Sequence, residues 1–220
     1  MISEKGLCKI LKSAYKGSGY TIILRTICAD GPARWRKNEI IINGATWAIR
    51  CETVDLPGEA AVQIVKDAGY LPVEPMNIQK GAPNQLVLRE VAEAHHDLLS
   101  SQDEDTVRMR QIPVIFRERW QLYQTEKGSV YAFDLELLKL IDFKAVQPET
   151  FMTVNGHLGL FCWSGSAVYL APGRFSRADE ERILYIAGLD WENQIDTEDP
   201  VVNISLFDAD KDEPVPEREE

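Results

Sequence analysis

Four two-residue turn sequences that end in glycine constrain the fold of this chain more than any other feature. Each lies between two runs rich in aliphatic, β-branched or aromatic residues, and the four are Asn43-Gly44, Lys127-Gly128, Asn155-Gly156 and Ser164-Gly165. Such pairs favour β-hairpins, because glycine and asparagine tolerate the left-handed backbone conformation that a tight turn requires. The sequence therefore predicts antiparallel strands joined locally, and few strand–helix–strand units of the kind that build a parallel sheet.

Short amphipathic helices are predicted between these hairpins. A helix over 3–16 begins at Ser3, a favourable N-cap, and Gly17 or Gly19 ends it. Further helices are predicted over 57–68, 89–100, 135–141 and from Ser176 to Gly188. Strands are predicted over 20–27, 39–51 (a hairpin), 76–79, 84–88, 112–117, 120–125, 129–133, 149–172 (three strands) and 201–207. The predicted fold class is α+β, with antiparallel hairpins alternating with short helices in two lobes.

Composition divides the chain into four predicted parts. Residues 1–100 form an N-terminal α+β lobe with a basic first helix, and residues 107–207 form a C-terminal lobe of antiparallel sheet and helices. The polar, acidic stretch 101–106 is predicted to link them. Residues 208–220 carry too many charges and prolines to pack, so we expect an acidic disordered tail.

Charge is segregated along the chain. The net charge is −11, but residues 1–50 contain nine Lys or Arg and three acidic residues, a net charge of +6. The remaining 170 residues therefore carry −17, and residues 190–220 alone carry twelve acidic residues against two basic ones, a net charge of −10. This asymmetry predicts either an electrostatic partner or an association of one end of the chain with the other.

The basic first quarter supplies the candidate binding residues. Four lysines of the first helix fall on one side, within about 60° of arc at 100° per residue, opposite an aliphatic face that includes Leu7 and Leu11. A second basic group surrounds Trp35 on a predicted loop, where an aromatic ring interleaved with cations can contact phosphates and bases. The candidate binding residues are Lys5, Lys9, Lys12, Lys16, Arg34, Trp35, Arg36 and Lys37.

Three other patterns predict no catalytic or metal site. Cys162 and Ser164 lie in a predicted hairpin, whereas a nucleophile elbow requires a strand followed by a helix. Glu93 and His96 have the spacing of one helix face, but di-iron bundles need this pair twice. A solvent-exposed histidine is the simpler explanation for His96. No phosphate-binding glycine motif occurs, so the sequence predicts no cofactor, no metal and no identifiable catalytic residue.

These patterns favour a non-catalytic protein-interaction or regulatory module that uses its basic N-terminal surface to bind a protein with an acidic surface. Two alternatives stay open: a nucleic-acid-binding accessory protein that uses the same residues, and an enzyme whose reaction no motif reveals. The acidic tail is a further candidate to cover the lysines. No apolar run is long enough to span a bilayer, and four scattered cysteines favour reduced thiols, so we expect a cytoplasmic protein. The sequence does not define its oligomeric state.

Overall fold

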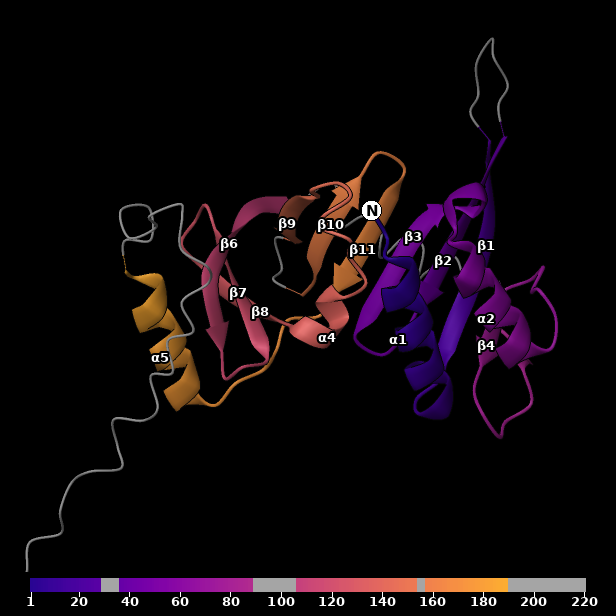
Figure 1. Cartoon of the computed structure of the whole chain (residues 1–220), viewed down its shortest axis with the longest axis horizontal. Coiled ribbons are helices and arrows are strands. Elements are labelled where there is room, and N and C mark those ends of the chain that lie inside the picture. Colours follow the sequence, from indigo (N-terminus) through magenta and orange to yellow (C-terminus); the bar gives the residue numbers. More distant parts are fainter. Residues whose placement is uncertain (29–35, 89–105, 154–156, 190–220) are drawn as a thin grey trace, which may run out of the picture.

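The computed structural model describes residues 1–28, 36–88, 106–153 and 157–189. Within these ranges it contains four α-helices and one antiparallel sheet of eleven strands, a mixed α+β fold that consists mostly of strands (Figure 1). The strand order is β5-β4-β1-β2-β3-β11-β10-β9-β6-β7-β8. Among the described residues, no helix is both long enough and apolar enough to cross a membrane.

The first half of the chain supplies one end of the sheet and two helices that pack on it. Its elements are α1 (Glu4–Lys16), β1 (Tyr20–Cys28), β2 (Arg36–Asn43), β3 (Trp47–Glu52), the 3-10 turn η1 (Thr53–Asp55), α2 (Gly58–Ala68), β4 (Met76–Ile78) and β5 (Gln85–Leu86). The helices predicted over 3–16 and 57–68 are confirmed, and so is the hairpin at Asn43-Gly44.

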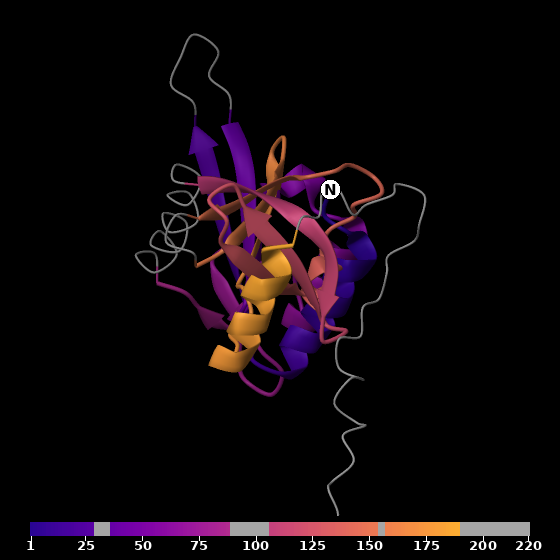
Figure 2. The ribbon, with the colours of Figure 1, turned by 90° about the vertical axis from the view of Figure 1, so that its left-hand side faces the viewer.

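The second half supplies the other end of the sheet. Its elements are β6 (Thr106–Phe116), β7 (Trp120–Thr125), β8 (Val130–Asp134), α4 (Leu135–Leu138), β9 (Glu149–Thr153), β10 (Gly159–Trp163), β11 (Ser166–Leu170) and α5 (Arg177–Ala187). Ser176 accepts a hydrogen bond from the Asp179 N–H at the start of α5, which confirms the predicted cap. Figure 2, which looks along the sheet from its β8 end, shows α5 in front of strands β6 to β8.

Two predictions for the second half differ from the structure. The strand predicted over 112–117 begins six residues earlier, at Thr106, so the last residue of the predicted linker lies in β6. The pattern of β6 is interrupted near Pro113, which has no N–H to donate to the ladder. Its register against β7 shifts between Gln111 and Ile115, and the Gln121 side chain donates to backbone carbonyls inside this bulge. The helix predicted over 135–141 is shorter and ends at Leu138.

One buried cluster contains residues from both halves of the chain. Leu7 of α1 and Ile49 of β3 belong to it together with Phe133 of β8 and Phe161 of β10. Strands β3 and β11 join the halves directly, with Ile49 opposite Val168. The two halves of the chain share one sheet and one buried cluster, so the division into two lobes stays a prediction. The predicted helix 89–100, residues 101–105 of the linker, the strand 201–207 and the tail lie outside the described residues.

Candidate binding surface

The lysines predicted to form a basic face lie together on the solvent side of α1. Leu7 and Leu11 on the opposite side are fully buried in the core, and this fixes the rotation of the helix about its axis. All four lysines are exposed, and we call them the lysine ridge: Lys5, Lys9, Lys12 and Lys16.

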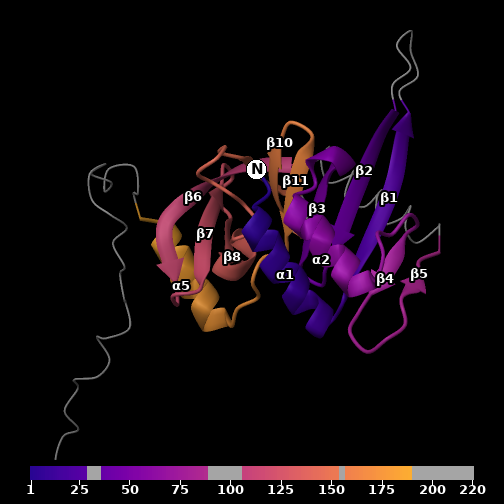
Figure 3. The same cartoon turned by 45° about the vertical axis from the view of Figure 1, so that its right-hand side comes forward.

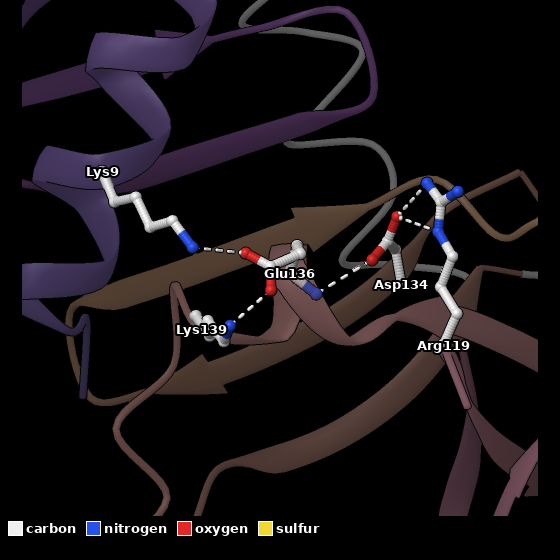
Figure 4. A network of polar contacts seen from close by, with 5 residues as sticks. All are labelled: Lys9, Arg119, Asp134, Glu136 and Lys139. Atoms are coloured by element: carbon white, nitrogen blue, oxygen red, sulfur yellow. Dashed lines mark hydrogen bonds and ion pairs between the residues drawn. The ribbon is translucent and has the colours of Figure 1, made fainter.

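One member of the ridge has an intramolecular partner. Lys9 donates to Glu136 of α4 with an Nζ–Oε2 distance of 2.7 Å, and Lys139 donates to the other oxygen of the same carboxylate (Figure 4). Hydrogen bonds from Lys139 and Lys9 lower the pKa of Glu136 to about 2, and the contact with Glu136 raises the pKa of Lys9. All three side chains are more than half exposed, so water and salt weaken this network.

Asp134 holds α4, and thereby Glu136, in its position beside α1. One oxygen of this buried carboxylate caps α4 by accepting from the Glu136 N–H at 2.9 Å. The other accepts from Arg119 at two nitrogens, 2.6 Å and 3.0 Å away (Figure 4). A two-point guanidinium contact restrains the carboxylate more than a single bond does. The contacts of Asp134 therefore fix the short helix α4, which places Glu136 beside Lys9.

The remaining members of the ridge are unpaired within the part of the chain that the structure describes. Lys5, Lys12 and Lys16 form no hydrogen bond or ion pair with any described residue. Their positive charges are therefore not neutralised locally by a described carboxylate. At 1.5 Å of rise per residue, Lys12 is about 6 Å from Lys16 and about 10 Å from Lys5 along the helix axis. The Debye length is roughly 8 Å at physiological salt, so neighbouring members of the ridge act together on an approaching anion.

A groove of about 410 Å³ lies along one side of the ridge. Its lining includes Ile10, Ala14 and Trp47 as well as Lys9 and Glu136 at the rim. A second, more polar groove of about 320 Å³ shares residues with the first at the carboxyl end of α1. The ridge is thus bordered by a concavity that offers apolar contact beside charge, which an isolated surface lysine does not have.

The other half of the predicted basic surface lies on a different element. Arg36 and Lys37 open β2, opposite Cys28 and Ile27 of β1, at the end of the long hairpin that projects beyond the sheet (Figures 1 and 3). Arg34 and Trp35 lie outside the described residues. The structure describes the backbone of Arg36 and Lys37 but not their side chains, so it brings the four lysines together and leaves the second basic group as a prediction.

The patterns that predicted no catalytic site have these outcomes. Ser164 and Gly165 form the turn between β10 and β11, so Cys162 lies in a hairpin as predicted. Glu93 and His96 lie outside the described residues. Among the described residues, no group of three His, Cys, Asp or Glu side chains is placed to hold a metal ion.

Several buried groups have shifted pKa values, but the shifts favour their neutral forms. Burial raises the pKa of Cys51 to about 12, and it also raises the pKa values of Tyr20 and Tyr123. A general base or an activated thiolate would need a shift in the opposite direction or toward neutrality. These residues therefore belong to the core and supply no acid–base pair.

Sequence reasoning identified the ridge but missed Glu136, Lys139 and the groove beside them. Glu136 is 127 residues from Lys9, and no periodicity links two such distant positions. Comparison of the chain with protein-family models, with curated proteins and with solved structures gives no match. The functional argument therefore depends on the geometry and charge of the surface itself.

Proposed function

We propose that this chain is a non-catalytic interaction module that binds an acidic surface of another protein through the lysine ridge. The observation that carries the proposal is that Lys5, Lys12 and Lys16 are exposed on one helix face and have no described ion-pair partner. A protein with net charge −11 that keeps such a face available is suited to an acidic partner.

The ridge supplies orientation and the groove supplies part of the affinity. An exposed ion pair contributes only about 0.2–1 kcal/mol, so three lysines alone give weak and salt-sensitive binding. The groove beside Ala14 and Trp47 adds apolar area that a partner side chain buries at roughly 25 cal/mol per Å². Complementary charge accelerates the encounter and selects the partner, and apolar contact prolongs the complex.

A cytoplasmic location and a two-lobed division belong to the same proposal. Cys8, Cys51 and Cys162 form no disulfide bond in the described part of the chain, which suits a reducing compartment. The acidic stretch 101–106 is proposed as the boundary between an N-terminal lobe that carries the ridge and a C-terminal lobe that braces it through Glu136.

The test is a pull-down from the host with the full chain as bait, performed with nuclease present and at two salt concentrations. The variant Lys5→Glu/Lys12→Glu/Lys16→Glu should lose acidic partner proteins, which should also elute from the native bait at about 0.5 M salt. The control variant, Lys127→Glu/Lys144→Glu/Arg174→Glu, changes the charge equally at exposed sites away from α1 and should retain them.

Three results would contradict the proposal. Equal loss of partners in both variants would mean that net charge, and not the ridge, governs binding. Partners that disappear on nuclease treatment would favour the nucleic-acid alternative. If the ridge variant retained the same partners as the native chain, the lysines would be ordinary solvent-exposed side chains with no role in binding.

A further inference from the structure

The groove of about 410 Å³ beside the lysine ridge lies between a helix and two short segments of the fold. One wall is formed by α1, and the other by residues 45–46 of the turn between β2 and β3 and residues 136–137 of α4 (Figure 1). Among the lining residues only Trp47 belongs to a strand, and this strand, β3, is paired with β2 on one side and with β11 on the other. The described walls of the groove therefore present no strand edge.

Carbonyl groups at both walls already accept hydrogen bonds within the fold. The Ala14 carbonyl accepts from the N–H groups of Gly17 and Gly19, at 3.0 Å and 2.8 Å. The Thr46 carbonyl accepts from the Ala171 N–H at 2.9 Å. An extended segment in this groove would therefore find no ladder for its own backbone groups, whereas an α-helix satisfies them within itself. This favours the helix-in-groove mode of recognition.

The length of the groove matches about two turns of a second helix. The α1 residues that line it form one stripe, and they are Lys9, Ile10, Ser13, Ala14 and Gly17. At 1.5 Å per residue this stripe extends over about 12 Å. Ser13, Ala14 and Gly17 are small, so a second helix can approach α1 closely here. Its side chains at i, i+4 and i+7 would fall along the groove, because they share one helix face and span about 10 Å.

Two unpaired lysines of the ridge lie on one flank of this stripe. Lys12 directly precedes Ser13 and Lys16 directly precedes Gly17, so each lysine lies about 100° around α1 from a groove residue. Both lysines are exposed, and neither forms a hydrogen bond or ion pair with a described residue. They are about 6 Å apart along the axis, which is the spacing of residues i and i+4 on any α-helix. Two acidic residues four positions apart on the occupant would therefore pair with them.

Glu136 determines which end of the occupant carries its acidic residues. At the other end of the groove this carboxylate accepts from both Lys9 and Lys139 (Figure 4). A further carboxylate there would be repelled by Glu136, and Lys9 already has a partner. We therefore expect the acidic residues near Lys16. Because acidic residues are favourable near the amino terminus of a helix, the occupant would lie antiparallel to α1.

We propose that this groove, together with Lys12 and Lys16, binds an amphipathic acidic α-helix of another protein. The helix has apolar residues at i, i+4 and i+7 that enter the groove. In an antiparallel pair the flanks that precede the two contact rows face each other, so the acidic residues directly precede apolar ones, at i−1 and i+3. The inference rests on the function proposed for the ridge, and it adds the conformation, the orientation and the residue spacing of the partner.

Two other occupants fit less well. In a second copy packed through its own α1, the two lysine ridges would oppose each other, and like charges repel. The α5 helix of a second copy carries Leu184 and Tyr185, which are 60% and 71% exposed. However, Glu181 of the same helix is paired with Arg177, 3.1 Å away, so a cation would approach the ridge together with the acid.

The test uses the full chain and a synthetic, isotope-labelled peptide, acetyl-Ser-Ala-Glu-Leu-Ala-Gln-Glu-Leu-Ala-Gln-Leu-Ala-Gln-amide. A peptide this short is at most marginally helical when free, so helical NMR shifts that appear on binding report the bound conformation. A second peptide contains the same residues in an order that distributes the leucines and glutamates around the helix. It should bind at least about tenfold more weakly than the first.

Three variants at exposed positions locate the site. Lys12→Glu/Lys16→Glu should weaken peptide binding by about tenfold. The control Lys127→Glu/Arg174→Glu makes the same change in charge outside the groove, and it should bind within about twofold of the native chain. Ser13→Arg places a long cationic side chain in the groove. Attraction by charge alone would then tighten binding, whereas an occupied groove requires binding to weaken, by about fivefold.

Several results would overturn the inference. They are no binding at about 1 mM peptide, equal binding of the two peptides, a bound peptide without helical shifts, and tighter binding by Ser13→Arg. If any of these occurs while the ridge variant still loses its acidic partners in the pull-down, the ridge proposal stands and the helical partner does not. A free chain that forms a dimer which the peptide dissociates would identify a second copy as the occupant instead.

Discussion

Two buried tyrosines should respond to the same substitution with opposite changes in stability. Tyr123 lies in the core, and its ring packs edge to face with the rings of Phe133 and Phe161, at a centroid distance of 5.5 Å from each. Its hydroxyl is buried and has no hydrogen-bond partner among the residues that the structure describes. Tyr20 is also buried, but its hydroxyl donates to Asp67 Oδ2 at 3.0 Å. The substitution to phenylalanine therefore removes an unpaired group at one site and a charge-assisted bond at the other.

The magnitudes follow from these environments. A buried, unpaired hydroxyl costs about 1–3 kcal/mol, and the void left by one oxygen, roughly 10 Å³, costs only about 0.2–0.3 kcal/mol. Tyr123→Phe should therefore raise the free energy of unfolding by about 1–2 kcal/mol. Tyr20→Phe should lower it by about 1.5–3 kcal/mol, because the Asp67 carboxylate loses a donor.

The assay is urea denaturation of both variants and of the native chain at neutral pH, followed by far-UV circular dichroism. The denaturant slope must stay constant, so that a change in midpoint reports stability. The reasoning would be refuted if Tyr123→Phe lowered the free energy of unfolding, or if both variants shifted it in the same direction.

Three further predictions concern packing, charge and thiol reactivity. Gly6→Ala should lower the melting temperature, because the new Cβ would collide with the Lys139 carbonyl, and this outweighs a helix-propensity gain of about 1 kcal/mol. The control Gly58→Ala places its Cβ in open space, so it should leave the melting temperature unchanged or raise it. Carboxyl NMR should find a pKa of about 2 for Glu136, and replacing Lys9 and Lys139 with methionine should move this pKa toward 4.5. The stability that the network contributes is therefore present above pH 4.5 and is lost as the pH falls through 2. Mass spectrometry after alkylation at pH 8 should find native Cys51 unmodified, because it is fully buried with a pKa near 12, and equal labelling in native and urea-unfolded protein would contradict this.

The elements that could be predicted from sequence are those whose determinants are local. The first helix has its cap, its apolar face and its terminating glycine within fifteen residues, and the structure matches it from Ser3 to Gly17. The hairpin at Asn43-Gly44 is equally local. The exposure of the lysine ridge follows from the buried face of the same helix, so this half of the candidate surface was also predictable.

Features that depend on tertiary contact could not be predicted in this way. Nothing local to β3 or β11 indicates that these strands pair, yet that pairing makes the sheet continuous. The contact between Lys9 and Glu136 needs α1 and α4 to lie side by side, which only the folded core determines. Strand β4 pairs with only three residues of β1, and no turn motif specifies where that pairing ends.

The acidic end of the chain bears on how the ridge would be regulated. Residues 190–220 carry a net charge of −10 and belong to the same chain as the ridge, so any contact between them would form at an effective concentration on the millimolar scale. They would compete with an acidic partner there, and the competition should weaken as salt rises. Lowering the net charge of this segment from −10 to −7 by Asp208→Asn/Asp210→Asn/Asp212→Asn should therefore tighten partner binding at low salt, as measured by calorimetry. The gain should vanish at about 0.5 M salt, and an affinity that stays the same at low salt would show that the segment does not compete for the lysines.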